Sequence, residues 1–247
     1  MRNLNYFASL LFVCSMLMIV TSAMSQNKIY GDTLITKDLM NPNREYWEIR
    51  TGTGGILQQG FMAEGKKDGL WREYSEGNGK LSKMEEYSHG KRNGASITVH
   101  INGSITSDVT YMNDSLNGIS THMSNYGNVK LMETYNNGIL DGRRRMFYDG
   151  GQLQEDGMYK NGQRIGLTKW YKGDGTISAE HTYSNGILNG PAKEYDEKGR
   201  IKMSGQFLNN NETGEWQVYQ DSVLVKKVIY KDGQIVKETP VKVKNEK

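Results

Sequence analysis

A glycine recurs in this chain at a constant step of 24 residues, at Gly94, Gly118, Gly142, Gly166, Gly190 and Gly214. A fixed period of 20 to 50 residues is typical of a repeat protein, in which each unit is one supersecondary element that is stabilised by stacking on its neighbours. The period therefore limits the chain to a serial architecture of short, similar units.

Large apolar residues follow the same period at two places in each unit. The first place, five residues after the glycine, holds mostly aromatic residues, among them Tyr74, Phe147, Tyr171, Tyr195 and Tyr219. The second place, seventeen residues after the glycine in most copies, holds Tyr87, Tyr111, Tyr135, Tyr159, Tyr183, Phe207 and Tyr230. The copy that begins at Gly69 has one extra residue in its turn, the last copy lacks one, and a worn copy begins near Trp47. We expect these glycines and aromatic residues to be the structural positions of the repeat.

Each unit has the sequence of a β-hairpin. Two runs of strand length, rich in Tyr, Ile, Val and Leu, flank a glycine-containing turn such as Asp196 to Gly199. Asn-Gly or Asp-Gly dipeptides join one unit to the next and reverse a chain between antiparallel strands. They are Asn137-Gly138, Asp141-Gly142, Asn161-Gly162, Asn185-Gly186, Asn189-Gly190 and Asp232-Gly233. A helix is disfavoured, because glycine about every ten residues would cost roughly 1 kcal/mol each.

A single hairpin is only marginally stable in water, whereas hairpins in series pair edge to edge and bury a continuous row of rings. We therefore predict an all-β fold, an elongated, twisted, single-layer antiparallel sheet of about seven to eight tandem 24-residue hairpin repeats. The repeated glycine either has a positive φ or lies under a neighbouring ring, and one sequence does not separate these alternatives. The apolar content of 36% is low for a compact globule and fits a thin, well-solvated sheet.

The first 25 residues have the features of a secretory signal peptide. Arg2 gives a positive start, Phe7 to Val20 is nearly continuous apolar sequence, and small residues follow at Ser22, Ala23 and Ser25. The alternative is a membrane anchor, but the apolar stretch is shorter than the ~20 residues of a membrane span. Because Val13 precedes Cys14 and apolar sequence continues beyond it, lipidation of Cys14 is disfavoured. We predict export through the secretory pathway to the periplasm, outer envelope or extracellular space.

Cleavage would remove Cys14, the one cysteine, and Arg2, leaving 30 Lys and Arg against 28 Asp and Glu. A chain without cysteine has no disulfide framework and no thiol catalysis. A nearly balanced charge does not predict nucleic-acid binding. We divide the chain into a signal peptide (1–25), a loose or strand-like lead-in (26–44), the hairpin repeats (45–235) and a Lys-rich C-terminal tail (236–247), which we interpret as edge protection or disorder.

The cycle of Asn/Asp-Gly, a Trp or Tyr strand, a turn Gly, Leu/Ile, then Tyr and Asn-Gly resembles the MORN repeat, in its bacterial variant from secreted or toxin–antitoxin-associated proteins. Asp68 to Leu81 and Asn189 to Ile201 show the cycle best, and it covers about 190 of the 247 residues. The resemblance implies a sheet of successive hairpins and a scaffold or partner-binding role, with membrane association proposed for some relatives. Glu194 to Ile201 also looks like a YD repeat of secreted toxin shells, and choline-binding repeats are similar in style but richer in Trp.

No catalytic, cofactor-binding or metal-binding pattern is present in the sequence. His89, His100, His122 and His181 have neither a Cys partner nor the spacing of zinc ligands. The adjacent carboxylates Glu155 and Asp156 are expected to point to opposite faces of a strand, which argues against their acting together in glycoside cleavage. We therefore predict that the protein is not an enzyme and takes no cofactor.

The densest basic cluster is Arg143, Arg144 and Arg145. It is either a patch for an anionic lipid or glycan or a charged strand surface balanced by Glu155 and Asp156 on the partner strand. The favoured function is an exported, non-enzymatic scaffold that binds an unidentified protein partner. The alternatives are an antitoxin or immunity protein that neutralises a toxin, and a carbohydrate- or lipid-binding module on the aromatic face.

Overall fold

A computed structural model describes residues 28–30 and 32–242, which form two compact units with a boundary between Gly103 and Ser104. All regular structure in these ranges is β-strand, paired antiparallel with the neighbours in sequence. This confirms the predicted fold class of tandem antiparallel hairpins. The predicted signal peptide, residues 1–25, lies outside the described residues.

The first unit is a single-layer sheet in which the strands pair in chain order. Its strands are β1 (Lys28–Tyr30), β2 (Thr33–Lys37), β3 (Arg44–Arg50), β4 (Ile56–Ala63), β5 (Lys66–Tyr74), β6 (Leu81–Ser88) and β7 (Lys91–Val99). β3 and β4 form the worn hairpin copy around Trp47. In the lead-in, β2 pairs with both β1 and β3, so this segment extends the sheet.

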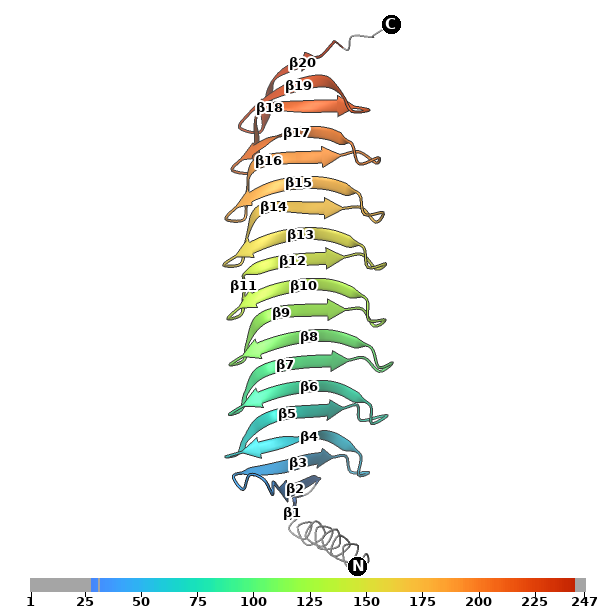
Figure 1. The fold of residues 1–247 in the computed structure, drawn as a ribbon, viewed down its shortest axis with the longest axis vertical. Coiled ribbons are helices and arrows are strands. Elements are labelled where there is room, and N and C mark those ends of the chain that lie inside the picture. The colour runs from blue at the N-terminus through green and yellow to red at the C-terminus, as the bar shows by residue number, and fades with distance from the viewer. Residues whose placement is uncertain (1–27, 31, 243–247) are drawn as a thin grey trace, which may run out of the picture. The chain divides into compact units, whose positions relative to one another are not determined.

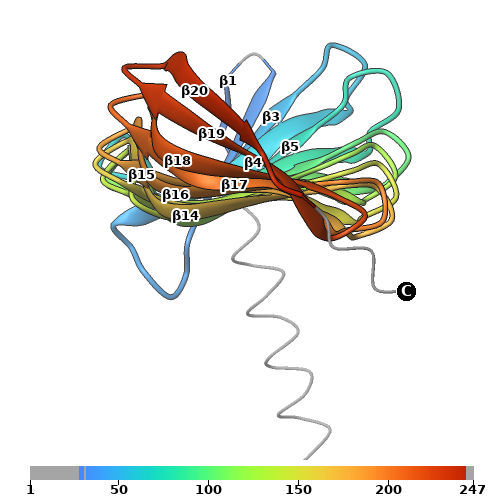
Figure 2. The same ribbon diagram turned by 90° about the horizontal axis from the view of Figure 1, so that it is seen from above.

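The second unit is also a single layer of antiparallel strands (Figure 1). Its strands are β8 (Ile105–Met112), β9 (Ser115–Met123), β10 (Val129–Asn136), β11 (Ile139–Leu140), β12 (Gly142–Phe147), β13 (Leu153–Lys160), β14 (Gln163–Tyr171), β15 (Ile177–Ser184), β16 (Ile187–Tyr195), β17 (Ile201–Leu208), β18 (Asn211–Gln220), β19 (Val223–Lys231) and β20 (Gln234–Pro240). Viewed along the stack, its hairpins overlie one another with a gradual change of direction (Figure 2), which is the twist expected of strands.

The C-terminal segment continues the sheet further than the sequence indicated. β20 runs to Pro240 and pairs with β19, so residues 236–240, assigned to the tail, form part of a strand. The amide of Val241 donates to the carbonyl of Val225. Because hydrogen-bonded and non-hydrogen-bonded pairs alternate along antiparallel strands, the backbone groups of the preceding residue, Pro240, point away from β19. Because proline has no N–H, the outer edge of β20 lacks a donor at this point, a common protection of an edge strand.

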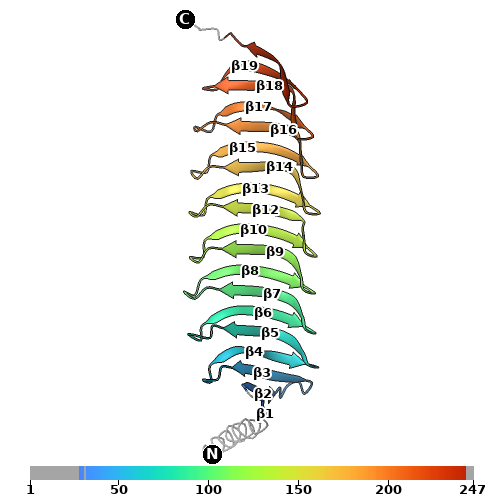
Figure 3. The same cartoon turned by 180° about the vertical axis from the view of Figure 1, so that it is seen from behind.

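The turns between successive hairpins are two-residue turns of type I′. Both central residues have positive φ in Asn137-Gly138, Asn161-Gly162 and Asn185-Gly186, as the type requires. The second predicted linker dipeptides, Asp141-Gly142 and Asn189-Gly190, are not turns; their glycines lie at the start of β12 and inside β16. The turns also stack, because the amide of Gly186 donates to Arg164 O at 2.8 Å and equivalent bonds recur in other repeats. Figure 3 shows these turns from behind.

The repeated glycine lies in a β-bulge with positive φ. In β14, the four steps from Ile165 to Lys169 lie opposite the two steps from Met158 to Asp156 of β13, and Gly166 in this segment has φ 64°. The glycines in the other repeats, from Gly69 to Gly214, also have positive φ. Of the two alternatives left open by the sequence, the positive φ applies to this position.

Replacing Gly166 with alanine is expected to lower the free energy of unfolding by about 1 kcal/mol, because an L-residue is strained in the left-handed region. No atom lies within 4 Å of the Cβ that would be added, so the backbone conformation is the sole source of the cost. Urea unfolding measures the change. Gly173→Ala is the matched control, since that site is also open and has no positive φ. Equal losses in the two variants would contradict the assignment of the bulge.

Candidate functional site

The two faces of the sheet have different chemistry. In each unit we call the face that bears the buried side chains, such as Trp71, Ser120, Thr168 and Trp216, the core face, and the other the open face. The aromatic residues that end each hairpin, Tyr87 to Tyr230, are all half-buried. On the other face, the Tyr195 hydroxyl donates to Glu180 at 2.9 Å. The predicted aromatic positions therefore do not form one buried row.

In each unit the most buried row consists of size-matched neighbours on adjacent strands, which the sequence pattern did not reveal. A small residue lies against a large one, or a hydroxyl or cation against a carboxylate. The row comprises Gly60 with Trp71, Glu85 with Ser96, Val109 with Ser120, Glu133 with Arg144, Gly157 with Thr168, His181 with Ala192, and Gly205 with Trp216. Where one partner of a pair is larger, the other is smaller, so the core face stays filled although the residue types differ from one repeat to the next.

The middle of the core face of the second unit holds a buried network of charges. Arg144 lies between two carboxylates, with Nε 3.0 Å from Glu133 and Nη1 2.8 Å from Glu155. Glu155 is 8% exposed and also accepts from Arg164 at 2.9 Å and from the Trp170 indole at 3.1 Å. Burial and the hydrogen bond to Glu133 raise the pKa of Tyr135 to about 12. These contacts pair the charges within the chain, although Arg164 Nη1 has no hydrogen-bond partner among the described residues.

The C-terminal part of the core face is a series of edge-to-face and tilted rings. The ring of His181 lies 5.2 Å from Trp170 and 5.7 Å from Phe207, and Phe207 lies 5.2 Å from Trp216. Such pairs contribute roughly 0.5–1.5 kcal/mol beyond area burial. Burial lowers the pKa of His181, although the charge of Glu194 opposes the shift, and its Nε2 has no hydrogen-bond partner among the described residues.

The fold is expected to lose stability as the pH falls below about 6.5, the usual pKa of histidine. The unfolded chain binds a proton at His181 in that range, whereas the folded chain resists it because its pKa is lower. The free energy of unfolding should therefore decrease from pH 7 to pH 5. His181→Phe keeps a ring in the stack and should reduce this decrease, as measured by urea titrations at each pH. An unchanged pH dependence in the variant would contradict this role of His181.

The open face of the second unit carries a ladder of alternating charge. Directly opposed residues on β12 to β16 are Arg145, Asp156, Lys169, Glu180 and Lys193. Lys169 Nζ lies 2.9 Å from Glu180, and a hydrogen bond from Arg143 holds the pKa of Asp156 below its usual value. Opposite charges across strands stabilise a sheet, so the ladder helps to set the register of these hairpins.

The predicted anionic-ligand patch is divided between the two faces. Arg143 lies on the open face and donates through Nε to Asp156 at 2.7 Å. Arg144 points to the core face, and Arg145 is opposite Asp156 on the open face. The structure therefore places Glu155 and Asp156 beside the arginines, as in the charged-strand alternative, and does not gather three guanidinium groups at one point.

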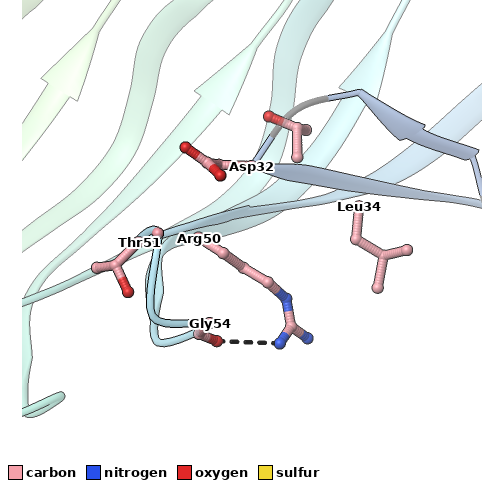
Figure 4. Close-up of a pocket in the computed structure, with 7 residues that line it drawn as sticks. Asp32, Leu34, Arg50, Thr51 and Gly54 are labelled. Carbon is pink, nitrogen blue, oxygen red and sulfur yellow. Dashed lines mark hydrogen bonds between the residues drawn. The ribbon is translucent and has the colours of Figure 1, made fainter.

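A hollow of about 450 Å³ lies at the start of the first unit and is lined by Asp32, Leu34, Arg50, Thr51 and their neighbours (Figure 4). Arg50 is its main polar group. Its Nη1 donates to the carbonyl of Gly54 at 3.1 Å, and its Nη2 lies 2.5 Å from Glu48. Both terminal nitrogens therefore have partners within the chain, whereas the buried Nε has no hydrogen-bond partner among the described residues.

Groups of three or more His, Cys, Asp or Glu side chains that could hold a metal ion are not found among residues 28–30 and 32–242. His89 is a turn residue with φ 51°, and His122 is 3.3 Å from the hydroxyl of Ser120. In the same part of the chain, no helix is long and apolar enough to span a membrane.

Residues 140–161 match the profile of a MORN repeat variant. The matched segment begins just before β12 and ends in the turn after β13, so it covers one hairpin and its bulge glycine, Gly142. A comparison with curated proteins gave no match. One hairpin of this periodic sheet is therefore similar to the MORN repeat variant.

Proposed function

We propose that the chain is an exported, non-enzymatic repeat module that acts as a protein-interaction or structural scaffold in the bacterial cell envelope. The match to a MORN repeat variant supports an interaction module, and the signal-like sequence of residues 1–25 supports export. The observation that carries the proposal is the contrast between the faces of the second unit. The charges of the core face are paired within the chain, whereas the open face leaves large apolar side chains exposed, Ile119 by 58% and Leu167 by 46%. Exposed apolar patches in a soluble protein mark interaction sites.

Envelope fractions of the source bacterium, cross-linked in the presence of the tagged full-length protein, test the proposal. We expect saturable capture of a protein by the wild type and weaker capture by the double variant Met158→Lys/Leu167→Lys, which changes the open face. Ile235→Lys is the matched control, because Ile235 is 53% exposed but lies opposite Tyr230 on the other face. Capture that is equal in all three proteins, or a chain found solely in the cytoplasm, would contradict the proposal.

A further inference from the structure

We infer that the open face of the second unit packs against the same face of a second copy of this chain. The inference deepens the proposed function, on which it rests for the role of this face, by naming the partner. Four properties of the face support it: its apolar side chains, their spacing, its charges and its size.

Seven large apolar side chains lie on this face, and each is between 39% and 58% exposed. Strand alternation and the opposed pairs place them together with the charge ladder. They are Met112, Ile119, Ile139, Met158, Leu167, Ile187 and Leu208. They occupy the half of the face nearer the two-residue turns, and polar neighbours such as Thr134 and Thr182 lie between them.

The spacing of these side chains follows that of the hairpins. They come from β8, β9, β11, β13, β14, β16 and β17, so nearly every hairpin contributes one or two. Strands are about 4.8 Å apart, which gives a period of about 9.6 Å per hairpin. A second copy presents side chains at the same period and meets them along the whole face, whereas an irregular globular surface meets few of them in register.

The charge ladder is complementary to itself. It reads positive, negative, positive, negative, positive from Arg145 to Lys193, and it reads the same in the reverse direction. When two copies face each other with an offset of one strand, four pairs of opposite charge form, and the cation at one end of each ladder lies outside them. A two-fold axis repeats the contact symmetrically, which is the commonest arrangement of homodimers.

The size of the face also suits a dimer. Nine strands of the second unit, β8 to β10 and β12 to β17, cross it. At about 4.8 Å per strand and about five residues of 3.3 Å, the patch covers on the order of 700 Å². A standard stable interface buries roughly 800 Å² on each partner.

Analytical ultracentrifugation of the full-length protein tests the inference. We expect a reversible dimer at concentrations up to about 100 µM. The double variant Met158→Lys/Leu167→Lys should raise the dissociation constant by about tenfold or more, because it places cations opposite the apolar side chains of the partner copy. Both sites are exposed, so the circular dichroism spectrum and Tm of the variant should match those of the wild type. Ile235→Lys should dimerise like the wild type.

A wild type that is monomeric at every concentration overturns the inference, whether or not it binds lipid vesicles. So does a dimer that Ile235→Lys disrupts and the double variant does not, since that dimer forms through the edge strand β20. Because sedimentation uses the purified chain alone, its failure leaves the proposed function open if the protein still captures an envelope partner. Failure of both measurements removes the proposed function as well.

Discussion

Replacing Gly205 with alanine is expected to lower the free energy of unfolding of the second unit by about 3 kcal/mol. An added Cβ would overlap the indole ring of Trp216, which is 1% exposed and has no room to move. The ring is held by contacts with Phe207 and Tyr230, and its Nε1 donates to Gln206 O at 3.2 Å. The clash therefore spreads to several neighbours. Urea unfolding followed by Trp fluorescence measures the loss.

A double-mutant cycle isolates the contact. Trp216→Leu alone should also destabilise the unit, because it leaves a cavity. Combined with Gly205→Ala, it should cost about 1–3 kcal/mol less than the sum of the two single changes, since the smaller side chain accommodates the new methyl group. Strict additivity would show that Gly205 and Trp216 do not share this space. The same relation holds in the first unit, where a Cβ on Gly60 would lie 2.5 Å from the ring of Trp71.

Replacing Arg144 with methionine is expected to cost about 3–5 kcal/mol, the usual penalty for removing one partner from buried charges. The variant leaves Glu133 without its cation and Glu155 with Arg164 alone. Both carboxylate side chains are only 12% and 11% exposed, so solvent does not replace the lost contacts. Thermal and urea unfolding at pH 7 measure the difference from the wild type.

Arg143→Met is the matched control on the open face. Arg143 is 52% exposed and pairs with Asp156, and exposed pairs contribute about 0–1 kcal/mol. If the two variants lost the same stability, the division of the arginines between a buried and an open face would be wrong.

The repeat architecture follows from the sequence because its determinants are local. The glycine period, the strand-length runs and the dipeptide Asn161-Gly162 each act within one hairpin, so one chain suffices to predict them. The bulge at Gly166 marks the point at which this reasoning fails. Counting back from the turn would pair Asp156 with Leu167, whereas the structure pairs it with Lys169. Neither the charge ladder nor the buried row is visible until this shift is known.

The sequence did not predict the buried row either, because its residues differ in type from one repeat to the next. Trp216, Ala192, Thr168 and Arg144 occupy the same position in successive repeats, and a search for a conserved residue type passes over them. What is maintained is the fit to the neighbouring strand: glycine beside Trp216 and a carboxylate beside Arg144. In the sequence, this fit is visible as matched sizes of two residues that lie 11 positions apart at this position of the repeat.

The register of the stacked hairpins determines which residues face one another, and interstrand nuclear Overhauser contacts in solution measure that register directly. The structure predicts backbone contacts between Asp156 and Lys169 and between Met158 and Ile165, on either side of the bulge. Contacts between Asp156 and Leu167 would show an unbroken register, with Gly166 paired regularly. In that register the opposed residues of the charge ladder, the pairs of the buried row and the side chains of the apolar face would no longer lie together.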